Sequence, residues 1–291
     1  MAEFGQLIER WFLDEELAAS LAAYRPEPND VIISPFGQCG TTWLQQTFHT
    51  LRTRGDMDFD DISAVVPWIE TASALKIDIN APQRALPRGF KSHLPYDQIP
   101  KGARYVISFR DPKDAIVSTH RFMEGWFLEP GAVPISDFAE GWNSNPRAQT
   151  GIWWHLLTWW EQRKNPRVLL FSYEEMIDDP EATVVRLARF CGIPLDDALL
   201  RLTLEHSSIN FMLEHKDKFA DGMMRALAER QCNLPPGGDS AKVRKGGVGG
   251  HRDRISAETT AMLDAAWNEV VRPATGFADY AAFEAAVRAE R

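Results

Sequence analysis

The sequence predicts a single α/β domain with a central, mostly parallel sheet flanked by helices. Short apolar segments typical of buried strands recur along the 291 residues, and helical segments separate them, as in sheets built with crossover helices. The first strand candidate runs through a glycine-containing turn directly into a helix, a geometry that suits phosphate binding. The length is near the upper size for one hydrophobic core, so we expect one domain over residues 1–291.

Four segments are expected to form the sheet. They are residues 31–34, 104–109 and 167–171, with a weaker candidate at 89–92. Asp111-Pro112 and Asp179-Pro180 each read as an N-cap followed by a proline in the first helical position. Ser256 is expected to cap a late helix.

One long stretch lacks regular structure signals. Glycine and proline cluster most densely over residues 233–250, and we expect a mobile loop within 213–250. A domain linker is less consistent with the sequence, because the helices after it need the same core.

Composition excludes several classes of protein. With 44% hydrophobic and 25% charged residues the chain has no disorder signature, and its net charge of −9 disfavours broad binding to nucleic acid or to an anionic membrane. Cys39, Cys191 and Cys232 fit neither a disulfide framework nor a zinc site. The first residues lack a signal-peptide pattern, and no segment approaches about 18 consecutive apolar residues. We therefore expect a cytoplasmic protein without a metal or a membrane insertion.

The turn after the first strand has the features of an anion cradle. A helix that begins at Thr41 would direct free N–H groups and its positive dipole end at an anion. Thr42 adds a second hydroxyl donor. The loop is not a Walker A loop, because Gly40 is followed directly by Thr41 without the lysine of that motif. Nucleoside triphosphate hydrolysis is therefore disfavoured.

Five sequence blocks resemble the cytosolic sulfotransferases, in the order found in that family. These enzymes transfer a sulfonate group from 3′-phosphoadenosine 5′-phosphosulfate (PAPS) to a hydroxyl or amine and release adenosine 3′,5′-bisphosphate (PAP). The blocks are Gly-Thr-Thr-Trp at 40–43, Lys-Ser-His-Leu-Pro at 91–95, the segment 105–118, Phe-Ser-Tyr-Glu-Glu-Met at 171–176 and Arg-Lys-Gly at 244–246. The resemblance implies a PAPS-dependent transferase that needs no divalent metal.

The resemblance implies a catalytic group at the end of the weak strand. It assigns the general base to His93, whose near-neutral pKa suits deprotonation of a hydroxyl. Lys91 would project to the same side and place positive charge near the transferred group. Gln38 stands where the family has a loop lysine that acts on the leaving-group oxygen, and a neutral amide is a weaker donor. Three explanations are open: Lys91 carries more of that load, another basic residue reaches in, or the chain is slow or inactive. We favour the first.

The remaining matched residues are assigned to the nucleotide. Arg110 and Ser118 would bind the 3′-phosphate, and the segment 244–246 would close over it. Trp43 and Tyr173 would contact adenine, with Ser207 at the family's hydroxyl position and Ile209 replacing a phenylalanine that packs on adenine. The complete expected set is Gln38, Cys39, Gly40, Thr41, Thr42, Trp43, Arg110, Ser118, Tyr173, Ser207, Ile209, Arg244, Lys245 and Gly246.

Two other functions remain open from the sequence. A nucleotide kinase on the same scaffold predicts Mg²⁺ dependence and ATP binding, and the missing Walker lysine counts against it. A non-catalytic PAPS- or PAP-binding protein is favoured by Gln38 and disfavoured by intact His93 and Lys91. The favoured acceptor is a small alcohol or phenol, and variable loops would decide which one. The family's dimer motif is not legible around residues 252–261, so the sequence leaves open whether the chain forms a homodimer.

Overall fold

A four-stranded parallel sheet organises the chain. The computed structural model describes residues 13–238, 242–244 and 246–290. The strands β1 (Val31–Ile33), β2 (Gly89–Lys91), β3 (Arg104–Phe109) and β4 (Val168–Ser172) lie in the order β2-β1-β3-β4. Every neighbouring pair is parallel. The predicted α/β domain and its four strand positions are confirmed, with strand ends shifted by one residue at most.

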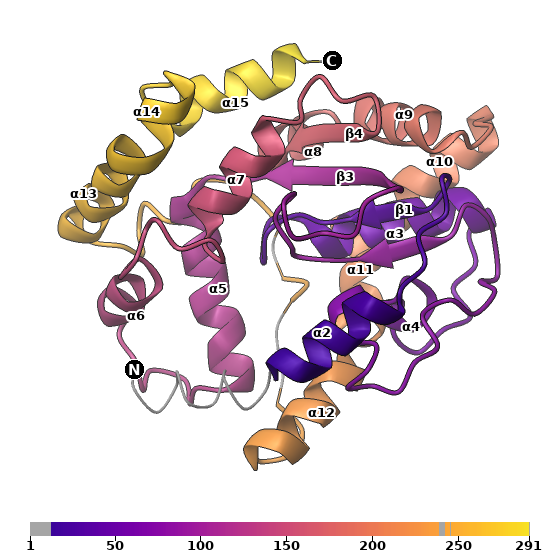
Figure 1. Ribbon diagram of the computed structural model, residues 1–291, viewed down its shortest axis with the longest axis horizontal. Coiled ribbons are helices and arrows are strands. Elements are labelled where there is room, and N and C mark those ends of the chain that lie inside the picture. Colours follow the sequence, from indigo (N-terminus) through magenta and orange to yellow (C-terminus); the bar gives the residue numbers. More distant parts are fainter. Residues whose placement is uncertain (1–12, 239–241, 245, 291) are drawn as a thin grey trace.

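Helices surround this sheet, and their order along the chain is visible in Figure 1. The first half contains α2 (Asp14–Ala23), α3 (Thr41–Thr53), α4 (Ile62–Val65), η1 (Ile69–Thr71), α5 (Pro112–Trp126), α6 (Ile135–Trp142) and α7 (Ile152–Trp160). The second half contains α8 (Tyr173–Asp178), α9 (Pro180–Cys191), α10 (Asp197–His206), α11 (Ile209–Glu214), η2 (Lys216–Phe219), α12 (Gly222–Cys232), α13 (Ala257–Ala266), the π-helical turn η3 (Trp267–Val271), α14 (Arg272–Thr275) and α15 (Tyr280–Ala289).

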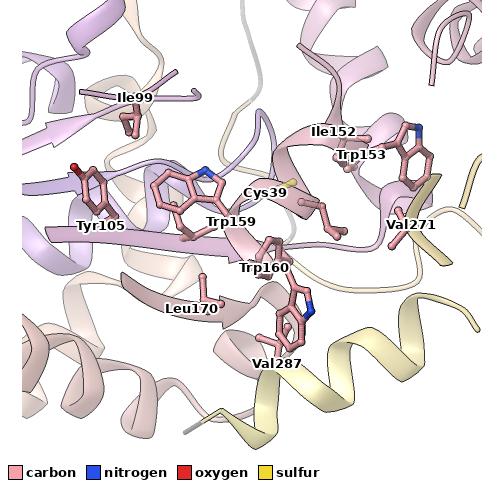
Figure 2. Close-up of a cluster of buried hydrophobic side chains, with 14 of the residues drawn as sticks. Cys39, Ile99, Tyr105, Ile152, Trp153, Trp159, Trp160, Leu170, Val271 and Val287 are labelled. Atoms are coloured by element: carbon pink, nitrogen blue, oxygen red, sulfur yellow. The ribbon is translucent and has the colours of Figure 1, made fainter. Parts of the chain in front are cut away.

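Each face of the sheet contributes to its own hydrophobic core, because successive strand side chains point to opposite faces. Val31 and Ile33 of β1 join a core with Phe48 of α3. Ile32, between them, joins a second core that contains Trp159 of α7 and Phe283 of α15. Figure 2 shows this second core. The apolar runs are therefore buried on both sides, as the sequence predicted for a parallel sheet.

Local capping signals in the sequence set several helix starts. The side chain of Asp111 accepts a hydrogen bond from the backbone N–H of Lys113 at the start of α5. Asp179 does the same for Ala182 in α9, and Ser256 for Thr259 in α13. These three predicted caps are confirmed.

The stretch 213–250 differs in part from the prediction. Its first half is helical, with η2 and α12, and Met224 and Leu227 of α12 pack into a third apolar cluster with Trp68 and Trp126. That packing stabilises a helix that shows little apolar periodicity of its own. The described residues between Cys232 and Ala257 form neither helix nor strand. The mobility of this segment stays a prediction.

Candidate functional site

The carboxyl ends of all four strands meet at one edge of the sheet, because the strands are parallel. β1 leads into the turn before α3, and β2 ends at Lys91 two residues before His93. β3 is followed by Arg110, and β4 by Tyr173. Residues from Leu17 to Arg254 therefore line one cavity of about 1670 Å³. Ligands of open α/β sheets bind at such an edge.

The turn before α3 has the conformation of a close-fitting cradle. Gln38 and Gly40 both have positive φ angles, of 64° and 97°. A side chain at Gly40 would meet Tyr173 and Met176, each at 3.1 Å from the added carbon. Glycine is needed here because the backbone angle is positive and because there is no space for a side chain. Cys39 is buried, and its carbonyl accepts a hydrogen bond from the Ser108 hydroxyl.

Two buried donors in this cradle lack a partner. The Thr41 hydroxyl and the Nε atom of Arg110 are both enclosed without a hydrogen bond to another described residue. The first N–H groups of α3, at Thr41 and Thr42, have no partner within the helix either. An unpaired buried donor costs about 1–3 kcal/mol. The predicted anion cradle therefore fits an oxyanion that would satisfy these groups.

Gln38 faces the part of the cavity assigned to the 3′-phosphate. Its Oε1 atom accepts a hydrogen bond of 3.1 Å from the Ser118 hydroxyl. Its carbonyl accepts one of 2.8 Å from Nη1 of Arg110. The Arg110 guanidinium in turn lies over the Tyr173 ring, 4.3 Å from the ring centre. The structure thus brings Gln38, Arg110, Ser118 and Tyr173 together, with the Gln38 side chain on Ser118 although the sequence resemblance assigns this position to the leaving-group oxygen. Their roles stay predictions.

Four arginines line this end of the cavity: Arg110, Arg121, Arg244 and Arg254. Burial lowers the pKa of Arg244, and the charges of the other three lower it further. Among the described ranges 13–238, 242–244 and 246–290, no ion pair to a carboxylate neutralises any of the four. Glu124 is the carboxylate whose charge acts on Arg121, but it forms no ion pair with it. A group of arginines without direct ion pairs to the described carboxylates suits a polyanionic ligand.

The sequence analysis missed two of these arginines. Arg121 lies three residues after Ser118 in α5, a spacing that places both on one helix face, so this signal was available. Arg254 depends on the path of the irregular segment after α12, which no local pattern specifies. Lys245 lies outside the described residues.

The residues assigned to adenine lie around the start of α3 and α11. The Trp43 indole donates a hydrogen bond of 2.8 Å to the carbonyl of Ser207. The Ser207 hydroxyl is itself occupied by the carbonyl of Thr203. Ile209 is partly exposed, and the backbone of Gly246 passes close to it. All these residues except Thr203 line the cavity, and their contact with adenine stays a prediction.

His93 is held in a defined orientation beside the cradle. Its backbone N–H donates to Oε1 of Glu70 at 2.7 Å, and its Nδ1 atom lies 2.7 Å from the carbonyl oxygen of Pro35. A carbonyl only accepts, so Nδ1 carries the proton and Nε2 has a free lone pair. Burial, and then the positive charge of Lys91, lowers the His93 pKa to about 3. This pKa is well below the near-neutral value expected from the sequence, because burial and Lys91 both disfavour the charged ring. The side chain is neutral at physiological pH, with a lone pair on Nε2.

Lys91 is almost fully buried next to this histidine. Its Nζ atom lies 3.0 Å from Oδ2 of Asp221 and 4.1 Å from the centre of the Trp68 ring. The Trp68 ring also contacts the His93 ring edge-on, with 5.1 Å between their centres. Asp221 and Lys242, which donates to the same carboxylate, were not predicted from the sequence. Both belong to the stretch 213–250, far from Lys91 along the chain.

The cavity also has an apolar chamber, and one of its walls, the Trp68 ring, contacts His93 edge-on. Aromatic side chains of several elements form its walls: Phe36, Trp68, Phe122, Trp126, Phe138 and Trp142. The tryptophans of α7 lie elsewhere. The spacing of the pairs 153–154 and 159–160 predicts a helix face that packs into the core, and Trp153, Trp159 and Trp160 are buried there (Figure 2). Trp154 is not part of that core, and its indole donates a hydrogen bond to Asp97.

The described part of the chain contains neither a candidate metal cluster nor a candidate membrane span. No three His, Cys, Asp or Glu side chains there are grouped so that they could hold a metal ion. No helix there is both long and apolar enough to cross a membrane.

Comparison with known proteins identifies the family. Residues 28–273 match the family described as "Sulfotransferase domain". The chain belongs to this sulfotransferase family. Sulfotransferase 1E1 of Bos taurus is 26% identical over 283 residues, covering 94% of this chain and 91% of the relative. Sulfotransferase 1 family member D1 of Mus musculus is 25% identical over 236 residues, 76% of each protein.

Solved structures support the same fold for this sulfotransferase. Retinol dehydratase in complex with androsterone and the inactive cofactor PAP has a TM-score of 0.72 and 18% identity, covering 93% of this chain and 94% of that one. A mouse sulfotransferase complexed with PAP has a TM-score of 0.65 and 21% identity, covering 90% of each. The family predicted from the five sequence blocks is confirmed, as is its α/β fold.

Proposed function

We propose that this sulfotransferase moves a sulfonate group from PAPS to a hydroxyl of a small-molecule acceptor. One observation carries the proposal: the free Nε2 lone pair of neutral His93 faces the same cavity as the arginine-lined anion cradle. A base and an anion site in one cavity are two of the requirements of sulfonate transfer to a hydroxyl, and the third is positive charge at the leaving oxygen. Two of the structural neighbours were solved with PAP, which is consistent with this nucleotide.

Each end of the nucleotide has suitable residues. The unpartnered Thr41 hydroxyl and the N–H groups at the start of α3 would hold the 5′-phosphosulfate. Arg110, Ser118 and Arg244 would bind the 3′-phosphate, with Arg121 and Arg254 adding positive charge beyond the matched family residues. Gln38 would serve the 3′-phosphate end, since its side chain already contacts Ser118.

The transfer itself is a displacement at sulfur. His93 takes the hydroxyl proton on Nε2 while the acceptor oxygen forms a bond to sulfur. The bond between sulfur and the bridging phosphate oxygen breaks, and its electron pair leaves on the phosphate of PAP. Negative charge grows on that oxygen, so positive side chains nearby lower the barrier most.

The acceptor would occupy the aromatic chamber beside His93. Its walls favour a flat, apolar molecule with the reacting hydroxyl at one end, such as a phenol or a bulky alcohol. A cytoplasmic location and the absence of a nucleic-acid partner stay predictions from composition.

The nucleotide preference tests this proposal first. PAP should raise the melting temperature far more than AMP or ATP, because the arginine cluster serves a 3′-phosphate. A hundredfold excess over Kd stabilises a protein by about 2.7 kcal/mol. Equal shifts for PAP and AMP would reject the nucleotide assignment. An acceptor screen with labelled PAPS then separates an enzyme from a non-catalytic PAP-binding protein, and Mg²⁺-dependent phosphoryl transfer from ATP would favour a kinase instead.

A further inference from the structure

Three buried charges meet near His93 in the lining of the same cavity. Lys91 ends β2, Asp221 precedes α12, and Lys242 comes from the irregular segment after it. Both ammonium groups donate to the same atom, Oδ2 of Asp221. All three side chains are at most 9% exposed and line the cavity together with His93.

The cluster of Lys91, Asp221 and Lys242 contains two positive charges and one negative charge. Lys91 and Asp221 alone form a neutral pair, and Lys242 adds the one positive charge in excess. The second oxygen of Asp221 is occupied by the Ser63 hydroxyl at 3.0 Å. Asp61 does not line the cavity; its carboxylate accepts two backbone N–H groups, and its charge raises the pKa of Lys242. Among the three linked side chains Lys91, Asp221 and Lys242, Lys242 therefore supplies the positive charge that Asp221 alone does not balance.

Lys242 is also close to the proposed base. The positive charges of Lys91 and Lys242 both lower the pKa of His93. Gln38, in contrast, is neutral, and its side chain is hydrogen-bonded to Ser118 at the 3′-phosphate end. The cavity thus contains two ammonium groups near His93, neither of them from the cradle loop.

We propose that Lys242 is the second cation of the transfer centre, held beside Lys91 by Asp221 and stabilising the charge that grows on the leaving phosphate. This inference rests on the proposed function. It selects, among the three explanations for Gln38, the one in which another basic residue reaches in. Without Lys242, the Lys91–Asp221 pair would present no net charge to the reaction.

The environment of Lys242 gives the proposal a pH signature. Burial lowers its pKa to about 8, although Asp221 opposes this effect; Lys91 lowers the pKa further, and Asp61 raises it. His93 also faces the cluster and is neutral over this range. Lys242 loses its charge as pH rises through about 8, so the rate of transfer should fall there.

Single-turnover transfer from PAPS to an acceptor found in the screen tests the inference. Lys242→Met keeps the apolar stem that lies by Phe122 and removes the charge, so it should slow the chemical step by about 10²-fold. PAP affinity should change little. Lys242→Arg, which stays charged, should keep most of the neutral-pH rate and lose the fall above pH 8.

A matched control and chemical rescue complete the experiment. Lys218→Met removes another lysine with an aromatic neighbour, Phe59, but does not line the cavity, so its rate should match the wild type. If Lys242→Arg is slow at every pH, ethylammonium added to Lys242→Ala decides, because the truncated side chain leaves room for the amine: recovery supports the inference and no recovery overturns it. A Lys242→Met enzyme as fast as wild type, or an Arg variant with the wild-type alkaline fall, also overturns it. A wild-type protein that binds PAP and transfers to no acceptor overturns the proposed function as well.

Discussion

The Nδ1 atom of His93 lies 2.7 Å from the carbonyl oxygen of Pro35, just before the cradle turn. This contact joins the proposed base to the loop that would hold the phosphosulfate. It fixes the tautomer of the ring, so that Nε2 has its lone pair free in the cavity. Base and cradle are therefore positioned relative to each other by one hydrogen bond.

Replacing His93 should remove most transfer while leaving nucleotide binding intact. His93→Ala deletes the base, and loss of a general base costs about 10²–10⁴ in rate. We expect this loss in single-turnover transfer, with a PAP melting shift equal to that of the wild type, because His93 does not belong to the arginine cluster. Near-wild-type turnover on a confirmed acceptor would show that another base acts.

The two ammonium groups of the transfer centre should be partly interchangeable with a cradle lysine. Lys91→Ala leaves Lys242 and Asp221 as a neutral pair, so the chemical step should slow strongly. Adding Gln38→Lys to that variant should restore part of the rate, since it returns a charged donor to the cradle. Single-turnover rates separate these effects from slow product release. An unchanged chemical step in Lys91→Ala would place the charge stabilisation elsewhere.

Substitution of Gly40 should damage the cradle. Gly40→Ala forces an L side chain into a φ of 97° and brings its Cβ to 3.1 Å from Tyr173 and Met176. We expect PAP affinity to fall by about tenfold or more, since the backbone at the start of α3 must shift. Titration calorimetry measures this loss.

Gly131→Ala is the matched control for Gly40→Ala. Gly131 also has a positive φ, of 78°, but open space surrounds it. Its substitution imposes backbone strain without crowding and away from the cradle, so PAP affinity should not change. Equal affinity for PAP in both variants would mean that the Gly40 backbone does not touch the nucleotide.

Gly89 packs so closely against Phe48 that a larger residue at position 89 should lower the stability of the fold. A Cβ at Gly89 would lie 2.2 Å from the Phe48 ring, in the core beneath the sheet. Gly89→Ala should lower the free energy of unfolding by about 1–3 kcal/mol, as overpacking does. Adding Phe48→Leu to Gly89→Ala should recover part of this lost free energy of unfolding. The same Phe48→Leu substitution made alone should not stabilise the protein. Denaturant unfolding measures these free energies. If Gly89→Ala were as stable as the wild type, the close contact between Gly89 and Phe48 would be contradicted.

Buried His155 should make the fold sensitive to acid. Its Nε2 donates to the carbonyl of Ser34, and burial lowers its pKa to about 3, below the ordinary value of about 6.5 in an unfolded chain. Between these values the unfolded state binds a proton that the folded state does not. Stability from this residue is therefore complete above pH 6.5 and falls as the pH drops below it.

His155→Gln removes that proton uptake. The stability advantage of the wild type over this variant should shrink by about 1.4 kcal/mol for each unit below pH 6. Urea unfolding at a series of pH values measures the difference. A constant difference between neutral pH and pH 4 would show that His155 is protonated equally in both states.

The sequence by itself determined the sheet, the cradle and most of the matched site residues, because their signals are local. Apolar β-branched runs indicate buried strands, Asp-Pro pairs set the starts of α5 and α9, and Gly40 before Thr41 and Thr42 marks an anion-binding helix start. The parallel order of the strands then collects their carboxyl ends at one edge.

Only the tertiary structure decided the charge of the transfer centre. Asp221 lies 130 residues from Lys91 along the chain, and Lys242 reaches the same carboxylate from a segment without helix or strand. No periodicity or capping rule specifies such a path, since it depends on how α12 packs against Trp68 and Trp126. Arg254 was not predicted from the sequence for the same reason, because its position also depends on the path of the irregular segment after α12. A charge cluster built from distant, irregular segments exists only once the chain is folded, whereas a strand, a turn and a cap carry their own sequence signals.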